Sequence, residues 1–273
     1  MSNSSSQPIA RVAAIQMVST PSLDENIATA RTLIADAAAQ GATLVLLPEY
    51  WPIMGMHETD KIGLAEAIDA GPIQTFMADV AREHNIWLIG GTLPMAAPQA
   101  DKVLNTMMVY DPSGARVQRY DKIHLFSFTK GTESYDEART IVHGNDVTTF
   151  DAPFGKVGLS VCYDLRFPEL YRAMGDCTLI VVPAAFTYTT GKAHWEILLR
   201  ARAIENQCYV LAAAQGGQHV NGRTTWGHSM LIDPWGEIKA ELPTGAGVVI
   251  GDIEPHHLSS VRENLPALKH RKL

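Results

Sequence analysis

The sequence predicts an α/β protein in which helices cover sheets, and three observations support this. Segments with the pattern of buried strands alternate with segments that have helical spacing. The second half of the chain repeats the order of the first, which indicates an internal pseudo-repeat. No linker or change in composition divides the 273 residues, of which 46% are hydrophobic. We therefore expect one large domain.

A strand over residues 11–17 and an alanine-rich helix over 24–40 open the first half, with Asp24 as the expected N-cap and Gly41 as the stop. The elements expected next are a strand over 43–48, a helix over 64–84 interrupted at Gly71-Pro72, a strand over 86–92, and a hairpin of residues 104–110 and 115–120. The hairpin turn, Asp111-Pro112-Ser113-Gly114, has the residues of a type I turn.

The second half is expected to follow the same plan. Its elements are a strand over 157–161, a short helix over 168–175, strands over 179–183 and 209–214 on either side of a helix over 192–206, and a hairpin turning at Asp233-Pro234-Trp235-Gly236. The repeat would place Glu49 and Cys162 at matching ends of strands in the two halves. Such strand ends are where α/β folds bind ligands.

Cys162 is the candidate nucleophile. It ends the apolar run that begins at Val157, and Pro168 suits the first turn of a helix. A thiol at a strand-to-helix turn lies near helix N–H groups, which lower a thiol pKa and hold a developing oxyanion. Taken alone, Cys162 is better explained as a buried structural cysteine, so catalysis needs support from other segments.

Two other segments favour catalysis. The strand expected over 43–48 is followed by Glu49, and Lys122 follows the first hairpin among aromatic and apolar neighbours. A base, an oxyanion donor and a nucleophile at the ends of strands make a plausible hydrolytic site. Each residue also has a simpler interpretation, since Glu49 could cap a helix and Lys122 could be a solvated loop charge.

Three ordered motifs resemble those of the nitrilase superfamily of carbon–nitrogen hydrolases. They are Leu46-Leu47-Pro48-Glu49, Asp121-Lys122-Ile123-His124-Leu125-Phe126, and the segment from Gly158 to Glu169 around Cys162. The resemblance runs from Val12 to about Asp252 and is closest to the Nit amidase branch, which the run from His194 to Asn206 also resembles.

The resemblance implies a four-layer α-β-β-α sandwich. The carbon–nitrogen hydrolase domain is expected over residues 9–255. It follows a polar, disordered tail over residues 1–8 and precedes a C-terminal tail over residues 256–273 that could contact a second subunit. The family also implies a homodimer or a higher homo-oligomer, and it implies no metal or organic cofactor.

The resemblance also implies roles for site residues. Cys162 attacks an amide carbonyl and forms a thioester, Glu49 moves the protons, and Lys122 with the Tyr163 backbone N–H holds the oxyanion. A second glutamate that orients Lys122 is expected at Glu137 rather than at Glu133, although both could belong to a solvated loop.

Four further residues are candidates for substrate binding. Arg166 either attracts a substrate carboxylate or forms a structural ion pair or a dimer contact. Phe186 and Thr187 follow the strand over 179–183 and could line the pocket. Trp195 is expected either in the pocket or in the core or an interface.

The function implied is cleavage of a small carboxylate-bearing amide with release of ammonia, and a deaminated-glutathione type of substrate is favoured. The alternatives are an ω-amide of an α-keto acid, an N-carbamoyl compound, or a nitrile, although the run Cys162-Tyr163-Asp164 lacks the Cys-Trp-Glu of nitrile hydrolases. A protein that kept the fold only for interactions is the alternative from another class.

Composition excludes several other classes. A net charge of −7 without a basic patch argues against nucleic acid, and no apolar run is long enough to cross a membrane. The polar N-terminus lacks the pattern of a signal peptide, so we expect a cytoplasmic protein. The other two cysteines, Cys177 and Cys208, are expected to be structural. No His-Glu-x-x-His or Cys-x-x-Cys motif indicates a metal.

Overall fold

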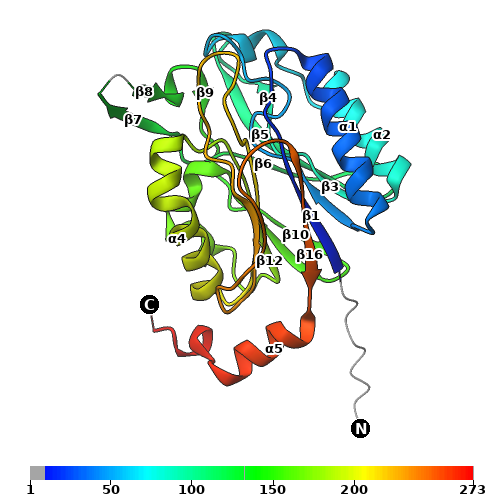
Figure 1. Ribbon diagram of the computed structural model, residues 1–273, viewed down its shortest axis with the longest axis vertical. Coiled ribbons are helices and arrows are strands. Elements are labelled where there is room, and N and C mark those ends of the chain that lie inside the picture. The colour runs from blue at the N-terminus through cyan, green and yellow to red at the C-terminus, as the bar shows by residue number, and fades with distance from the viewer. Residues whose placement is uncertain (1–9, 132, 273) are drawn as a thin grey trace.

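Two sheets pack face to face, with helices on their outer faces, in the computed structural model, which describes residues 10–131 and 133–272 (Figure 1). The eight-stranded sheet has the order β16-β1-β2-β3-β5-β4, with β6 and β9 paired to β5. Its strands are β1 (Ala10–Gln16), β2 (Leu44–Leu46), β3 (Trp87–Ile89), β4 (Leu93–Ala96), β5 (Val103–Tyr110), β6 (Arg116–Asp121), β9 (Ile141–Val142) and β16 (Gly247–Ile253). The N-terminal tail expected over residues 1–8 lies outside the described residues.

The second sheet has six strands in chain order, from β10 to β15. They are β10 (Thr149–Ala152), β11 (Gly155–Leu159), β12 (Leu179–Ala184), β13 (Tyr209–Ala214), β14 (Ser229–Ile232) and β15 (Ile238–Leu242). A separate hairpin, β7 (Ser127–Lys130) and β8 (Glu133–Asp136), projects from the body beside the second sheet (Figure 1).

The helices form the outer layers. Those described are α1 (Leu23–Ala39), α2 (Pro72–His84), α3 (Pro168–Ala173), α4 (Tyr188–Asn206) and α5 (Pro255–Asn264). Helices α1 and α2 cover one sheet and α4 covers the other, while α5 extends below the body (Figure 1). No helix within residues 10–131 or 133–272 is long and apolar enough to cross a bilayer.

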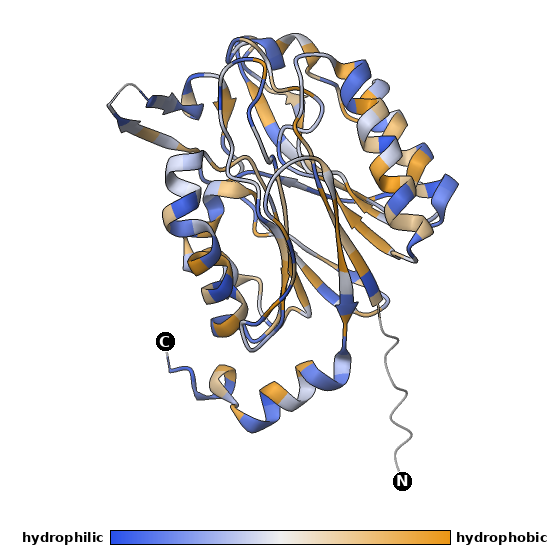
Figure 2. Cartoon of the chain, in the orientation of Figure 1, coloured by the Kyte–Doolittle hydropathy of each residue, from blue (hydrophilic) through white to orange (hydrophobic). Residues whose placement is uncertain are grey.

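Successive residues of a strand face opposite sides of the sheet, and apolar residues on both sides explain why each sheet is covered on both faces. In β1, Val12 and Ala14 belong to the core between the sheets, whereas Ala13 and Ile15 belong to the core beneath α1 and α2. A strand that is apolar on both faces must be covered on both. Many strands of the two packed sheets accordingly colour as hydrophobic in Figure 2, whereas β8 is hydrophilic and the helices show mixed colours. The predicted four-layer α-β-β-α sandwich is thus confirmed.

The pseudo-repeat is visible in the sheets. Strands β1, β2 and β3 run parallel, as do β11, β12 and β13, and an antiparallel hairpin follows each triplet. Glu49 follows the second strand of its triplet and Cys162 follows the first strand of its own. Both residues lie at the carboxyl ends of strands, as predicted.

Local sequence features explain why α1 and α2 begin at residues other than those predicted. The N-cap of α1 is Ser22, whose hydroxyl accepts the Glu25 N–H, so Asp24 lies in the first turn. The expected helix over 64–84 begins only at Pro72, because Gly71 has a φ of 113° and ends the preceding segment. The buried Glu66 carboxylate then accepts the first free N–H groups of α2. The predicted turn of the first hairpin and the strand over 209–214 are confirmed.

Candidate active site

Two carboxylates share one buried lysine at the edge of the first sheet. Lys122, directly after β6, places its Nζ 2.8 Å from Glu49 Oε1 and 2.7 Å from Glu137 Oε2. The side chains of Lys122 and Glu49 are 0% and 1% exposed. The structure therefore brings together three of the four predicted catalytic residues through direct ion pairs. Glu133 instead accepts the Thr189 hydroxyl at 3.0 Å, so Glu137 is the second glutamate at this lysine.

Glu49 is held by donors from three parts of the chain. Its Oε1 accepts the Asn105 side-chain amide at 2.9 Å as well as Lys122, and its Oε2 accepts the Ala185 N–H at 2.9 Å. Asn105 comes from β5 and Ala185 follows β12, so the carboxylate bridges the two sheets. Sequence reasoning missed both donors because they are distant in the chain.

Burial sets the protonation of this cluster. Desolvation raises the pKa of Glu49, with Lys122 opposing and Glu137 adding to the shift. Burial also opposes the charge of Lys122, but Glu137 and Glu49 outweigh it and hold the Lys122 pKa well above its usual value. For Glu137, Lys122 and the N–H of Phe126 outweigh burial, and the pKa is lowered. Lys122 is therefore a charged ammonium between two carboxylates. Glu137 stays ionised, whereas the raised pKa of Glu49 prepares it to accept a proton.

Cys162 sits on a strained turn. It lies three residues beyond the last residue of β11, at the start of a short 3₁₀-helix (Cys162–Arg166), with a φ of 49° that is uncommon for a residue with a Cβ. Burial, and then the charge of Glu49, raise the thiol pKa well above its ordinary value, so the thiol is the resting form. Because the charge of Glu49 acts on this thiol, the Glu49 carboxylate is its candidate proton acceptor.

Asp164 fixes this turn and was not singled out from the sequence. Fully buried, its carboxylate accepts the Val161 N–H at 2.8 Å and the Tyr120 hydroxyl at 2.7 Å. It also accepts the His124 N–H at 3.0 Å and lies 2.7 Å from His124 Nδ1. Tyr120 and His124 flank Lys122 in the chain, so one carboxylate sets the position of Cys162 relative to Lys122.

A small cavity opens in front of the thiol. It is lined by Phe126, Cys162, Tyr163, Arg166, Ala185, Phe186, Thr187 and Thr190. The Arg166 guanidinium lies over the rings of Tyr163 and Phe186, at 5.7 and 5.5 Å from their centroids. Its Nη1 lies 3.3 Å from His194 Nδ1, and no carboxylate pairs with it within residues 10–131 and 133–272. The structural ion pair considered for Arg166 is therefore absent there.

Trp195 occupies a different place from the other predicted pocket residues. Its side chain is fully buried, its indole N–H donates to the His228 carbonyl at 2.8 Å, and its ring packs 4.8 Å from that of Phe186. Helix α4 turns this face toward the second sheet, so Trp195 supports the pocket wall from behind. The expectation that it could line the pocket is corrected, and the alternative of a core residue fits the structure.

The fold and the site define a class, that of hydrolases built on a four-layer sandwich with a buried Cys–Glu–Lys cluster. A family profile described as carbon–nitrogen hydrolase matches residues 11–263. The chain belongs to this family and is a Nit-type amidohydrolase.

Similar proteins agree with this assignment. The deaminated glutathione amidase of Synechocystis is 43% identical over 95% of this chain and 97% of its own. The omega-amidase NIT2 of Mus musculus is 38% identical over 96% and 95%. The crystal structure of the C. elegans NitFhit protein superposes with a TM-score of 0.90 at 38% identity, over 98% of this chain and 66% of that one.

Gly91 controls the position of Glu49, which gives a first prediction. It has a φ of 54°, and a Cβ there would lie 2.1 Å from the carbonyl oxygen of Pro48, the residue before Glu49. Gly91→Ala should destabilise the protein by about 3 kcal/mol, since backbone strain and a clash add up. Gly175→Ala, at a φ of 75° with nothing within 4 Å, should cost only about 1 kcal/mol. Urea unfolding of the two variants measures the difference, and equal losses would contradict this account.

Proposed function

We propose that the protein hydrolyses a small carboxylate-bearing amide through a thioester on Cys162. The observation that carries the proposal is Arg166, a guanidinium without a carboxylate partner among the described residues, in the same cavity as the thiol. Arginine binds carboxylates through paired, charge-assisted hydrogen bonds. A substrate carboxylate on Arg166 would place the neighbouring carbonyl carbon at the thiol.

The proposed reaction begins when Glu49 takes the thiol proton as sulfur attacks the carbonyl carbon. The oxyanion is held by the Lys122 ammonium and the Tyr163 N–H, an arrangement that stabilises charge only as it develops. Glu49 passes its proton to the leaving nitrogen as the C–N bond breaks. Glu49 next deprotonates water, which attacks the thioester, and the proton returns to the sulfur. Because Glu137 stays charged beside Lys122, it keeps this ammonium in place throughout.

The favoured substrate class follows from the relatives. The names of the similar proteins, deaminated glutathione amidase and omega-amidase, both describe amide hydrolysis. The higher identity to the former supports a deaminated-glutathione type of substrate for this chain, with an ω-amide of an α-keto acid as the second candidate.

A panel of amides, nitriles and N-carbamoyl compounds tests the proposal. We expect turnover of carboxylate-bearing amides, with kcat/KM falling by at least roughly tenfold when the carboxylate is replaced by a methyl group. Arg166→Gln should remove this preference. Equal turnover of the charged and uncharged amides would contradict the role of Arg166. No turnover of any compound, together with an unreactive Cys162, would favour the interaction role.

The pH profile gives a second prediction. Glu49 works as a base only when ionised, and its pKa is raised above the usual 4.5, chiefly by burial. Activity should therefore be full at high pH and fall as the pH drops through a value above 4.5. Asn105→Ala removes a hydrogen-bond donor to the ionised Glu49 carboxylate. The pH at which activity is half lost on the acid side should therefore rise by about one unit. An acid-side midpoint of the kcat/KM profile at or below pH 4.5 would contradict Glu49 as the base.

We further propose a cytoplasmic homodimer that uses α4 and the C-terminal segment. Ile197 and Ile204, one heptad apart on α4, are 70% and 49% exposed, and Trp235 in the adjacent hairpin is 63% exposed. Exposed apolar patches of this kind mark interaction surfaces. All three cysteines are free, as suits a reducing compartment. Sedimentation should give twice the chain mass, and Ile197→Lys should give monomers. A monomeric wild type would overturn this proposal.

A further inference from the structure

An imidazole outside the cavity in front of the thiol contacts the arginine inside it. His194 lies in the first half of α4, and its Nδ1 is 3.3 Å from Nη1 of Arg166. Arg166 lines the cavity of the thiol, whereas His194 lines a separate cavity, here called the α4 cavity. The other titratable side chains that line the α4 cavity are Lys192, Glu196, His228 and Glu241. The contact therefore joins the proposed substrate site to a group that no step of the proposed reaction uses.

The chemistry of the two groups fixes the direction of their hydrogen bond. A guanidinium carries N–H donors and no acceptor. Nδ1 of His194 therefore accepts the hydrogen bond, which requires a neutral ring with its proton on Nε2. A protonated ring would offer only another donor and a second positive charge. The contact between His194 and Arg166 thus exists only with a neutral imidazole.

This hydrogen bond directs the guanidinium of Arg166, which its aromatic contacts do not. The rings of Tyr163 and Phe186, at 5.7 and 5.5 Å, hold the cation against their faces without directing its N–H groups. Within residues 10–131 and 133–272, His194 provides the only hydrogen bond of this guanidinium. With Nη1 engaged, the Nε and Nη2 donors remain as an adjacent pair, which is the arrangement that a carboxylate binds.

The position of His194 is fixed by its neighbours on α4. Trp195, the next residue, is fully buried and donates its indole N–H to the His228 carbonyl at 2.8 Å. Gly191, three residues before His194, lets the helix approach Trp226, since a Cβ on this glycine would lie 2.2 Å from the Trp226 Cβ. The first half of α4 is therefore packed closely against the body, and it holds the imidazole at Arg166.

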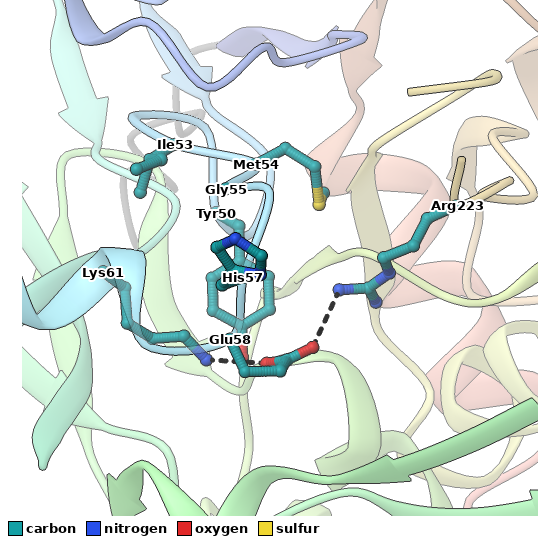
Figure 3. Close-up of a pocket in the computed structure, with 8 residues that line it drawn as sticks. All are labelled: Tyr50, Ile53, Met54, Gly55, His57, Glu58, Lys61 and Arg223. Carbon is teal, nitrogen blue, oxygen red and sulfur yellow. Dashed lines mark hydrogen bonds and ion pairs between the residues drawn. The ribbon is translucent and has the colours of Figure 1, made fainter. Parts of the chain in front are cut away.

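A neutral acceptor leaves the charge of Arg166 available to a substrate. Another cavity shows the alternative, because in Figure 3 Glu58 lies between Lys61 and Arg223 and forms an ion pair with each. A carboxylate partner of this kind compensates a cation and competes with any carboxylate that a substrate brings. The imidazole of His194 instead orients Arg166 without neutralising it.

We propose that neutral His194 is a positioning residue for carboxylate recognition, because it holds the Nε and Nη2 donors of Arg166 ready for the substrate carboxylate. The proposal rests on the carboxylate-bearing amide as the substrate. His194 acts through Arg166, so its effect is confined to substrates that carry the carboxylate. The effect falls on KM rather than on kcat, since the contact with Arg166 is present in the bound substrate and in the transition state alike.

His194→Asn and His194→Asp, which differ in charge but hardly in size, test the proposal. The readout is the ratio of kcat/KM for succinamic acid to that for butyramide, which has a methyl group in place of the carboxylate. His194→Asn keeps a neutral acceptor and should hold this ratio within about twofold of the wild type. His194→Asp should lower the ratio roughly tenfold, because its charge pairs with Arg166. Equal ratios in the two variants would overturn the proposal.

A double variant shows whether His194 acts through Arg166. His194→Leu removes the acceptor and should lower the ratio roughly three- to tenfold, through KM for succinamic acid. In the Arg166→Gln background the same change should lower the ratio no further. Lys192→Met, which alters another side chain of the α4 cavity, is the matched control and should leave the ratio unchanged. A ratio that His194→Leu does not move, or a fall that persists without Arg166, overturns the role of His194 and leaves the amidase intact.

The outcomes also separate this proposal from the amidase reaction. If no amide is hydrolysed, the amidase proposal fails, and calorimetry of succinamic acid with Cys162→Ala still decides the role of His194. Affinity that falls when His194→Asp is added to this variant, and is kept when His194→Asn is added, supports the positioning role. Affinity that is equal in the two double variants, or binding that is absent, overturns it.

Discussion

Cys162→Ala should abolish amide hydrolysis and leave a folded protein. Without sulfur no thioester forms, and removing an activated nucleophile lowers kcat by roughly five orders of magnitude. The fold should tolerate the change, because alanine keeps the Cβ at this buried position and removes a thiol whose burial raises its pKa. Product release and the circular dichroism spectrum measure the two effects.

Cys177→Ala is the matched control. This thiol is also buried, but it lies beneath the second sheet and is 3.9 Å from the Met174 carbonyl. We expect unchanged kcat with a modest loss of stability, about 1 kcal/mol for a small buried group. Activity retained in Cys162→Ala, or lost equally in both variants, would reject the assignment of the nucleophile.

Lys122→Met should cost both activity and stability. The Lys122 ammonium separates Glu49 from Glu137, and its removal leaves two carboxylates together in a buried site. Breaking a buried ion pair on one side costs about 3–5 kcal/mol. Loss of an oxyanion donor should in addition lower kcat by roughly 100- to 1,000-fold. Urea unfolding and steady-state kinetics measure the two losses.

The loss of stability should depend on pH in a definite direction. Without Lys122 the pKa values of Glu49 and Glu137 rise above their unfolded values, so the folded state binds more protons than the unfolded state. Stability then falls as the pH rises through these raised values, and Lys122→Met should be less destabilised at pH 5 than at pH 8. Lys239→Met, at an exposed pair with Glu237, should change stability by less than about 0.5 kcal/mol at both pH values. A pH-independent loss would show that the carboxylates are not the cause.

Much of the fold could be predicted because its signals are local. Apolar runs, the two Asp-Pro-x-Gly turns and the proline at the start of α3 lie within single segments of the chain. Glu49, Lys122 and Cys162 could be found because each follows a strand within a recognisable motif. Glu137 was favoured over Glu133 on its motif alone, and the structure places it against Lys122.

The rest of the site depends on contacts between distant segments. Asn105, Ala185 and Asp164 each donate to or accept from groups far away in the chain, and nothing in their own neighbourhood indicates this. Glu133 could have belonged to a solvated loop, whereas the structure places it in hairpin β7–β8, whose strands pair with each other. Trp195 could not be assigned to pocket or core, because the direction of a side chain on α4 depends on how the helix packs.

The measurement that tests the central claim most directly is the mass of the protein during turnover. Acid quenching of the wild type with a hydrolysed amide, followed by peptide mapping, should find the acyl group on the peptide that contains Cys162. Cys162→Ala treated in the same way should carry no adduct and release no product. Steady turnover with no acyl adduct on that peptide, and undiminished turnover in Cys162→Ala, would contradict the thioester mechanism.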